Sequence, residues 1–307
     1  MPQNETNKYE TYSAFLAIIG RPNSGKSTLM NAVLGEKLAI VSPMPQTTRK
    51  TMRGIYTKEN MQIVLMDTPG IHRGKHLLNK LLYEQSVSVL KDEGIDIICY
   101  LVDMSRDFGE EEDDIAQKIE KSKTKAKILV VFNKVDKITV EKGMTKLEEF
   151  NSRYPFLADV PKLHLSAVAE DGAEKFLEFV KPFVPQNPML YPPDEITDRD
   201  MRFMAAECVR KQIIDLTAQE VPHSAFVSIL QYEESPDLHE ITADIHVETS
   251  GQKAIIIGDN GRMISQIRTN AQKRMRGISG VKTKFSLFVK ITPNWREKGD
   301  FLSGAGF

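Results

Sequence analysis

The stretch Gly20-Arg21-Pro22-Asn23-Ser24-Gly25-Lys26-Ser27 fits the pattern G-x-x-x-x-G-K-[ST]. The apolar run 14–19 before it predicts a buried strand, and the run 28–34 after it predicts a helix, so the glycines fall in a strand-to-helix turn. Backbone N–H groups in such a turn converge on an anion, a lysine can bridge the outer phosphates, and a serine hydroxyl can coordinate magnesium. The stretch therefore predicts a phosphate-binding loop, with expected nucleotide contacts from Gly20, Asn23, Ser24, Gly25, Lys26, Ser27 and Thr28.

The composition indicates a folded protein with two domains. At 307 residues the chain exceeds the usual single domain. A net charge of −1, with 41% hydrophobic and 27% charged residues, is typical of a soluble globular protein, and no run has the roughly 18 apolar residues of a membrane span. Residues 1–11 are polar and lack a signal-peptide core, and Cys99 and Cys208 offer no disulfide framework. We therefore expect the reducing cytoplasm as the compartment.

Positive charge gathers near the C-terminal end of the chain. Between residues 251 and 298, eleven Lys or Arg side chains stand against two acidic ones, a local excess of nine positive charges. The rest of the chain is correspondingly acidic. A basic segment of this kind predicts an anionic partner.

Apolar runs and helical patterns alternate along the first 183 residues. Continuous apolar runs predict buried strands at 61–66, 95–102, 128–132 and 163–165. Amphipathic patterns between them predict helices at 77–90, 110–121, 140–150 and 173–183. The segment 43–53 is rich in Pro and Thr, and we expect it to be too polar for the core. This alternation predicts a doubly wound α/β domain with a mostly parallel sheet.

Five prolines between residues 182 and 193 interrupt regular structure and mark a linker. We place the first domain at 1–184, the linker at 185–198 and the second domain at 199–307. Thr197 with Asp200 resembles a capping box before an amphipathic helix. The patterns that follow predict strands at 225–230 and 240–247, helices at 251–257 and after residue 261, and a strand at 281–291. This order predicts an α+β domain, and the Gly-rich tail after Leu302 is expected to be mobile.

Two motifs follow predicted strands of the first domain. Asp67-Thr68-Pro69-Gly70 places Asp67 to hold magnesium through water, while the Gly70 N–H faces the terminal phosphate. In Asn133-Lys134-Val135-Asp136, the Asp136 carboxylate can accept two hydrogens from N1 and the exocyclic N2 of guanine, a pattern that adenine does not offer. Asn133 would brace the base and the neighbouring loop, and the stem of Lys134 can lie on the ring face.

A third motif, Ser166-Ala167-Val168, follows the predicted strand 163–165 and can present a backbone N–H to guanine O6. Each motif stands at the carboxyl end of a predicted strand, where open α/β sheets bind ligands. Together with the phosphate loop they predict a site for GTP or GDP, with Mg²⁺ as cofactor.

These motifs resemble those of the translation-factor-like GTPases over residues 15–183. The resemblance implies a further threonine, between the first helix and the second strand, that senses magnesium and the γ-phosphate. In Gln46-Thr47-Thr48-Arg49 we favour Thr48, with Thr47 as the alternative. The implied magnesium ligands are then Ser27, Thr48 and Asp67. The residues expected to act in hydrolysis are Lys26, Thr48 and Gly70.

One departure from the related GTPases bears on mechanism. Ras-like GTPases carry a water-orienting glutamine directly after the D-x-x-G motif, whereas this chain has Ile71. An isoleucine side chain cannot hydrogen-bond water. We therefore predict slow basal hydrolysis, in which Lys26, magnesium and backbone donors stabilise charge and a partner or an ordered switch loop orients the water.

Gly258-Asp259-Asn260-Gly261 lies between two predicted helices in the second domain. This loop and the element order helix-strand-strand-helix-helix-strand resemble a type II KH domain. The GXXG loop of such a domain clamps the backbone of about four single-stranded nucleotides. Many such loops carry a basic residue where this chain has Asp259, which is expected to weaken the phosphate contact. The expected RNA contacts are Lys253, Ile257, Gly258, Asn260, Gly261, Arg262, Ile264, Arg268 and Lys273.

A GTPase domain with Gln-Thr-Thr-Arg, joined by a short linker to a type II KH domain, is similar to the Era family of bacterial ribosome-assembly GTPases. The resemblance covers nearly the whole chain. It implies GTP-dependent binding of 16S ribosomal RNA near its 3′ end and a role in assembly and maturation of the small ribosomal subunit. It also implies a cytoplasmic monomer, with peripheral association at the inner membrane as in some members of the family.

Two other functions stay open from the residues alone. A non-catalytic binding module would use the nucleotide for structure only; Ile71 favours it, whereas Lys26, Ser27 and Asp67 argue against it. An ATP-using RNA enzyme would require that Asp136 does not face guanine. Single-turnover hydrolysis with and without RNA tests the first alternative, and nucleotide competition tests the second.

Overall fold

The computed structural model describes residues 10–42, 44, 47–71, 76–218 and 220–307. They form two compact units, one up to residue 198 and the other from residue 199, apart from residues 76–78, which group with the second. Gln46 of the Gln-Thr-Thr-Arg motif and residues 1–9 of the polar N-terminal stretch lie outside the described residues. The boundaries placed at residues 184 and 198 stay predictions.

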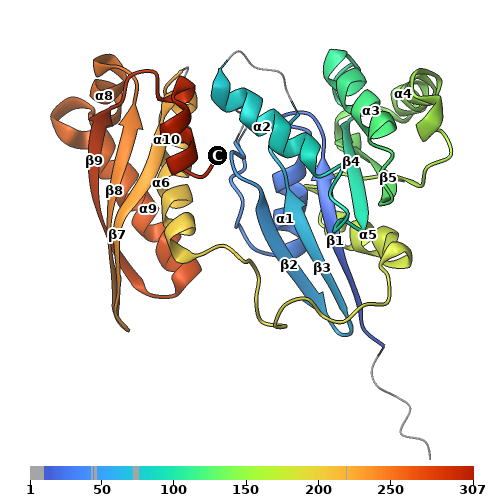
Figure 1. Ribbon diagram of the computed structural model, residues 1–307, viewed down its shortest axis with the longest axis horizontal. Helices are drawn as coiled ribbons and strands as arrows, with labels where there is room; N and C mark the ends of the chain where they lie inside the picture. Colours follow the sequence, from blue (N-terminus) through green and yellow to red (C-terminus); the bar gives the residue numbers. More distant parts are fainter. Residues whose placement is uncertain (1–9, 43, 45–46, 72–75, 219) are drawn as a thin grey trace, which may run out of the picture. The chain divides into compact units, whose positions relative to one another are not determined.

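The first unit is built on a six-stranded sheet in the order β2-β3-β1-β4-β5-β6 (Figure 1). Neighbouring strands are parallel except β2 and β3, which are antiparallel. The predicted α/β fold with a mostly parallel sheet is therefore confirmed. The strands are β1 Tyr12–Ile19, β2 Met52–Lys58, β3 Met61–Asp67, β4 Ile97–Asp103, β5 Lys127–Asn133 and β6 Lys162–His164. The helices are α1 Lys26–Leu34, α2 Leu77–Ser88, α3 Glu110–Ser122, α4 Val140–Arg153 and α5 Gly172–Val180.

Strand β2 is missing from the predicted elements. The expectation that segment 43–53 is too polar for the core is wrong at its end, because Arg49, Thr51 and Met52 are buried. The strand lies at the edge of the sheet, where only one neighbour, β3, has to be matched. An edge strand needs no continuous apolar run, so periodicity does not reveal it.

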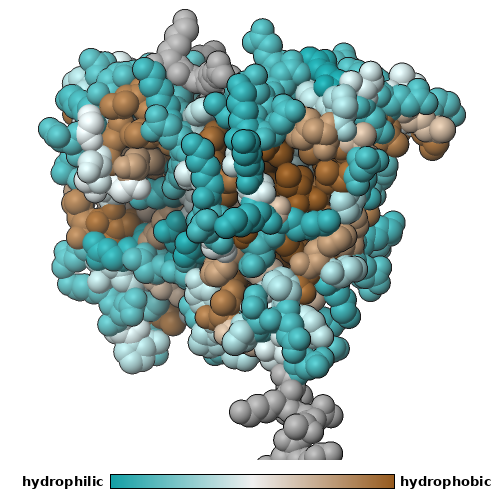
Figure 2. Space-filling model, turned by 45° about the vertical axis from the view of Figure 1, so that its right-hand side comes forward, coloured by the Kyte–Doolittle hydropathy of each residue, from teal (hydrophilic) through white to brown (hydrophobic). Residues whose placement is uncertain are grey.

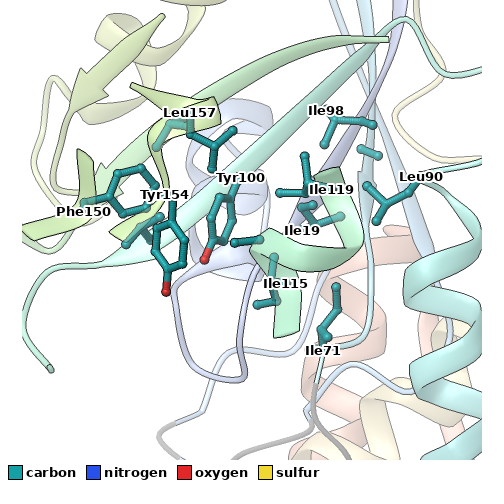
Figure 3. Close-up of a cluster of buried hydrophobic side chains, with 14 of the residues drawn as sticks. Ile19, Ile71, Leu90, Ile98, Tyr100, Ile115, Ile119, Phe150, Tyr154 and Leu157 are labelled. Carbon is teal, nitrogen blue, oxygen red and sulfur yellow. The ribbon is translucent and has the colours of Figure 1, made fainter. Parts of the chain in front are cut away.

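The core of the first unit lies on both faces of the sheet. Figure 3 shows one face, where Ile19, Ile98 and Tyr100 from the strands meet Ile115 of α3 and Phe150 of α4. Alternate strand residues such as Leu16 and Leu65 are also fully buried, as expected for parallel strands covered on both sides. This packing fixes the carboxyl ends of β1, β3, β4 and β5, where the predicted motifs stand.

The predicted linker, segment 185–198, is hydrogen-bonded along the first unit, and we call it the strap. The Ser13 hydroxyl donates to the Pro188 carbonyl at 2.7 Å. Gln62 is fully buried, and its Oε1 accepts from the Leu190 and Tyr191 N–H groups at 2.8 and 2.9 Å. Its Nε2 donates to the Tyr191 carbonyl at 2.9 Å. The prolines thus exclude regular structure from the strap, while side chains of β1 and β3 supply its hydrogen bonds.

The second unit has the predicted helix-strand-strand-helix-helix-strand order. Its three-stranded sheet has the order β7-β8-β9, with β7 antiparallel and β9 parallel to β8. Its helices α6 and α9 pack against each other, and α9 also packs on β9. The elements are α6 Met201–Leu216, α7 Val221–Ser224, β7 Phe226–Glu234, β8 Leu238–Val247, α8 Ser250–Ile257, α9 Arg262–Ser279, β9 Lys282–Ile291 and α10 Gly299–Gly304.

Two expectations for the second unit are wrong in detail. Asp200 itself caps α6, because its carboxylate accepts from the Phe203 N–H at 2.7 Å. The Thr197 hydroxyl instead donates to the carbonyl of Arg53 on β2, so the expected capping box does not form. The tail beyond Leu302, expected to be mobile, is helical as far as Gly304, with Leu302 buried and the Phe307 N–H bonded to the Leu302 carbonyl.

On the face that Figure 2 shows, hydrophilic side chains predominate and apolar side chains are exposed in patches. Exposed large apolar side chains of the first unit include Val140 and Met144 on α4 and Val168 beyond β6. Within the described ranges, no helix is both long and apolar enough to cross a membrane.

Candidate nucleotide site and RNA-binding loop

The phosphate loop joins β1 to α1, as predicted. Gly25 adopts φ 106° just before α1, and a Cβ there would overlap the side-chain amide of Asn133. The backbone therefore requires glycine at this position both for its dihedral angle and for the close approach of the base motif. The result is a helix N-terminus whose first N–H groups are available to an anion.

A cavity of about 470 Å³ opens at this helix end, within the usual range for small-molecule sites. It brings together most of the predicted nucleotide contacts: Asn23, Gly25, Lys26, Ser27, Thr28, Thr48, Gly70, Asn133, Lys134, Asp136, Ser166 and Ala167. The alternative threonine, Thr47, also lines the cavity. Gly20, Ser24 and Asp67 do not line it, and the side chains of Ser24 and Asp67 are fully buried. Their nucleotide contacts, like those of the lining residues, stay predictions.

The three predicted magnesium ligands meet at one point. The hydroxyls of Ser27 and Thr48 donate to Asp67 Oδ2 at 2.6 and 3.0 Å, and the two hydroxyl oxygens lie 3.1 Å apart. Asp67 is fully buried, and its Oδ1 has no hydrogen-bond partner among the described residues. Burial raises the pKa of Asp67, although Lys26 and the two hydroxyls oppose that rise. Two hydroxyls and a carboxylate with one unbonded oxygen are hard oxygen donors, which fit Mg²⁺.

Lys26 is buried in the loop, with 6% of its surface exposed. Its Nζ donates to the carbonyls of Gly20 and Arg21 at 3.1 and 2.9 Å. Burial lowers the pKa of Lys26 to about 8, and the nearby Asp67 charge only partly offsets this effect. The ammonium is therefore a cation that lacks a full counter-charge, which phosphate oxygens would supply.

This pKa predicts a pH dependence of nucleotide binding. The nucleotide-free protein loses the Lys26 proton above about pH 8, whereas bound phosphate favours the ammonium, so binding at higher pH must take up a proton. The Kd for GDP is expected to rise toward about tenfold per pH unit above pH 8. Calorimetry at pH 7 to 9 measures both the Kd and the proton uptake. Lys26→Met is the control, because it keeps the titration of guanine itself; an equal pH slope in this variant would contradict the assignment.

The base motif follows β5 and is tied to the phosphate loop. Asn133 donates from Nδ2 to the Ser24 carbonyl at 2.8 Å and accepts at Oδ1 from the Ala167 N–H at 2.9 Å. The Ala167 N–H is thus bonded to Asn133, and Val168, 75% exposed, lines the same cavity. Asp136 is exposed on the cavity wall. Asn133 therefore joins the three motifs by hydrogen bonds.

The sequence reasoning missed several lining residues. Asp103 lines the cavity from the end of β4, Ser105 and Arg106 line it from the loop that follows, and segment 40–42 lines it from the loop after α1. The available signal was Asp103 itself, an aspartate that ends an apolar strand just as Asp67 does. No D-x-x-G or other recognised motif begins at Asp103, so the sequence alone did not mark it as a site residue.

Ile71 points away from this cavity. Its side chain is 1% exposed and packs in the hydrophobic cluster with Ile19 and Ile115 (Figure 3). Its N–H donates to the Gly20 carbonyl at 3.2 Å, which holds the segment after Asp67 against the phosphate loop. The position that carries a glutamine in Ras-like GTPases therefore serves the core here.

The GXXG loop lies between α8 and α9, as predicted. Gly258 adopts φ 70°, and a Cβ there would approach the Met263 Cβ to 2.6 Å, so glycine is required. Asn260 and Gly261 also have positive φ, which turns the backbone sharply before α9 begins. Among the other predicted RNA contacts, Arg262, Arg268 and Lys273 are exposed, whereas Lys253, Ile257 and Ile264 are half-buried. The loop thus stands beside exposed cations, and its RNA contacts stay predictions.

Comparisons with known proteins identify both units. A family described as "50S ribosome-binding GTPase" matches residues 15–134, and a family described as "KH domain" matches residues 220–296. The GTPase Era of Thermotoga petrophila is 40% identical over 292 residues, which are 94% of this chain and 95% of the relative. The GTPase Era of Geotalea uraniireducens is 38% identical over 296 residues, or 96% and 97% of the two chains.

A solved structure is similar to this chain over nearly its whole length. It is a crystal structure of Era in complex with MgGDPNP and nucleotides 1506–1542 of 16S ribosomal RNA. The match has a TM-score of 0.89 and 31% identity and covers 96% of this chain and 99% of that chain. The P-loop GTPase fold followed by a KH domain, expected from the sequence, is confirmed. The chain belongs to the Era family of GTPases.

Proposed function

We propose that this chain is a GTP-binding and slowly GTP-hydrolysing switch that binds 16S ribosomal RNA near its 3′ end and assists assembly and maturation of the small ribosomal subunit. The observation that carries this proposal is one cavity lined by the phosphate loop, Thr48, Gly70 and the Asn133–Asp136 motif together. The solved Era structure with MgGDPNP and 16S nucleotides supports the choice of both ligands.

In the proposed mechanism, each part of the cavity has one task. Lys26 leaves the Gly20 and Arg21 carbonyls for the outer phosphate oxygens and stabilises their charge. Ser27, Thr48 and Asp67 would hold Mg²⁺, which supplies charge neutralisation on the phosphates when bound. The Gly70 N–H donates to the terminal phosphate, and Asp136 selects guanine by accepting from N1 and N2.

We attribute slow turnover to the lack of a side chain at position 71 that could orient the attacking water. The Ile71 side chain is in the core, so position 71 offers no side-chain hydrogen bond to that water. Backbone groups, an ordered Thr48 loop or a bound partner would have to orient it. Turnover of many GTP per second by the isolated protein would contradict this part of the proposal.

The KH unit is proposed to read RNA through the GXXG loop and its neighbouring cations. Close backbone approach at Gly258 and Gly261 would clamp the sugar-phosphate chain, with Lys253, Arg262, Arg268 and Lys273 neutralising phosphates. Asn260, Ile257 and Ile264 would contact the bases. GTP is proposed to order Thr48 and Gly70 and thereby change RNA affinity.

The decisive test combines nucleotide and RNA. Filter binding with the 3′-terminal segment of 16S RNA, in the presence of a GTP analogue or GDP, measures whether affinity depends on the nucleotide. Single-turnover hydrolysis with and without that RNA, and competition of GTP by ATP, exclude a non-catalytic module or an ATP-using enzyme. Equal RNA affinity with both nucleotides would remove the switch.

Substitution of Asp259 tests the RNA surface directly. Asp259→Lys is expected to raise RNA affinity about threefold to tenfold, because a carboxylate beside the phosphate chain becomes a cation. The slope of log affinity against log salt should steepen by about 0.7 for the added phosphate contact to a single strand. Asp237→Lys, in the exposed turn between β7 and β8, adds the same charge away from the loop and is the control. Equal gains from both variants would indicate a general charge effect.

Location and assembly are proposed from family resemblance only. We propose a monomer in the cytoplasm that associates peripherally with the inner membrane. Light scattering of the purified chain measures its mass in solution. Flotation with vesicles that contain anionic lipid tests the membrane association, and recovery of all protein in the lipid-free fraction would remove it.

A further inference from the structure

The Asp103 carboxylate contacts both ends of the nucleotide cavity. It ends β4, is fully buried and has no place in the motifs that define the site. Its Oδ2 lies 2.7 Å from Lys134 Nζ in the base motif and 3.7 Å from Arg21 Nη2 in the phosphate loop. One carboxylate group therefore joins two loops that arrive from different strands.

The contacts around Asp103 fix its orientation. Its Oδ1 accepts from the Ser105 N–H at 3.0 Å and from the Ser105 hydroxyl at 2.6 Å. Burial tends to raise the pKa of Asp103, but the hydrogen bonds from Lys134 and Ser105 outweigh burial and lower it. The group is thus ionised at neutral pH, and Ser105 aims the remaining oxygen at the two cations.

Lys134 and Arg21 transmit this position to the phosphate loop. Lys134 Nζ also donates to the Asn23 carbonyl at 2.6 Å. Arg21 is 5% exposed, and its Nη1 is 2.9 Å from Glu112 Oε1 on α3. The phosphate loop is therefore held at Asn23 by Lys134 and at Arg21 by Asp103, and the Glu112 carboxylate also holds Arg21. The four side chains have no net charge, so each buried charge has an opposite partner.

We propose that Asp103 is a positioning residue that sets the spacing between the phosphate loop and the base motif, so that the two ends of one guanine nucleotide are bound together. The phosphates and the base of one nucleotide act as two linked ligands, and the phosphate loop and the base motif are the two half-sites that bind them. Binding both parts at once gives an affinity gain, which depends on the spacing of the two half-sites. This inference rests on the proposed function, because it assumes a guanine nucleotide in the cavity.

The test compares how tightly the full-length protein binds a whole guanine nucleotide and each of its two separate parts, the nucleoside and the pyrophosphate. Binding of Mg-GDP, guanosine and Mg-pyrophosphate is measured for the unaltered chain and for Asp103→Asn. We expect the Kd for GDP to rise about 10- to 100-fold, because the two half-sites lose their spacing. Guanosine and pyrophosphate should weaken by about threefold or less, because each half-site persists.

Three further variants separate positioning from a general structural effect. Glu112→Gln removes the second partner of Arg21 and should weaken GDP and pyrophosphate alike, with guanosine unchanged. Asp113→Asn breaks the 2.7 Å ion pair of α3 with Arg153, away from both loops, and should leave all three ligands unchanged. Ser105→Ala keeps the Asp103 charge and removes the 2.6 Å hydroxyl bond to its Oδ1, which leaves only the backbone N–H of residue 105 to orient that oxygen. This variant replaces Asp103→Asn if Asp103→Asn does not fold, and the same pattern is expected.

The outcomes are distinct. An unchanged GDP affinity in Asp103→Asn and Ser105→Ala would overturn the inference, and so would an equal loss for all three ligands, which indicates local unfolding. Failure of the unaltered chain to bind GDP, or a preference for ADP, would instead overturn the proposed function and this inference with it.

Discussion

Replacing Asp136 with alanine is expected to raise the Kd for GDP by roughly a thousandfold. The carboxylate is proposed to accept two hydrogens from guanine, and each charge-assisted bond contributes about 1.5–3 kcal/mol, so the pair is equivalent to roughly three factors of ten. Asp136 is exposed on the cavity wall, so the substitution leaves no buried group unsatisfied. Titration with a fluorescent guanine nucleotide measures the change.

The same variant should lose its preference for guanine over adenine. The ratio of the Kd values for ADP and GDP is expected to fall by about the same thousandfold, because the lost bonds are to hydrogens that adenine cannot supply and the Kd for ADP should not change. Glu148→Ala, an exposed carboxylate of α4 outside the cavity, is the control and should change neither value. Retained guanine preference in Asp136→Ala would show that another group reads the base.

Replacing Lys26 with methionine is expected to lower the rate of GTP hydrolysis about 100- to 1,000-fold. The ammonium is proposed to stabilise charge that develops on the phosphates, and loss of one such donor in a dry site has this magnitude. Single-turnover release of phosphate from saturating GTP measures the chemical step. Lys91→Met removes an exposed cation beyond α2 and should leave the rate unchanged.

The unfolding temperature of Lys26→Met shows whether the variant loses activity because it loses catalysis or because it loses stability. Methionine removes a charge whose burial is costly, as the pKa of about 8 indicates, while the Gly20 and Arg21 carbonyls lose a donor. These effects oppose each other, so the unfolding temperature without nucleotide is expected to change little. A large drop in that temperature would attribute the lost activity to folding.

The phosphate loop and the strands beside it were predictable because their signals are local. Seven residues of β3 and seven of β4 include continuous apolar runs, and each run ends in an aspartate. Within segment 20–25, Gly25 is required because the backbone turns sharply there and lies close to the Asn133 side chain. Such features depend on neighbouring residues, and the sequence therefore displays them.

Features that depend on distant contacts were not predictable. Strand β2 has few apolar residues, and its pairing with β3 makes it a strand. Asp103 ends an apolar strand, but its role in the site follows only from the convergence of Arg21 and Lys134 on its carboxylate. The side-chain direction of Ile71 follows from space in the core. Each is decided by tertiary contacts that no local pattern records.

Local rules also failed where two residues compete for one role. Thr197 and Asp200 both fit a helix cap by type and spacing, and either can accept a backbone hydrogen bond. The carboxylate takes the cap of α6, while the Thr197 hydroxyl bonds the carbonyl of Arg53. Thr197 therefore bonds to the first unit instead of capping α6. This outcome depends on Arg53 of β2, so residues 197–200 alone do not predict it.

The strap also orders the events of synthesis. The Pro188 carbonyl of the strap accepts a hydrogen bond from the Ser13 hydroxyl of β1, 175 residues earlier in the sequence. Near the middle of the strap, the Leu190 N–H donates to Gln62 of β3. A chain made from its N-terminus therefore cannot complete these hydrogen bonds until the residues just before α6 have emerged. Contacts so far apart in sequence form late and slowly. The GTPase unit therefore lacks these bonds to β1 and β3 until synthesis has reached the beginning of the KH unit.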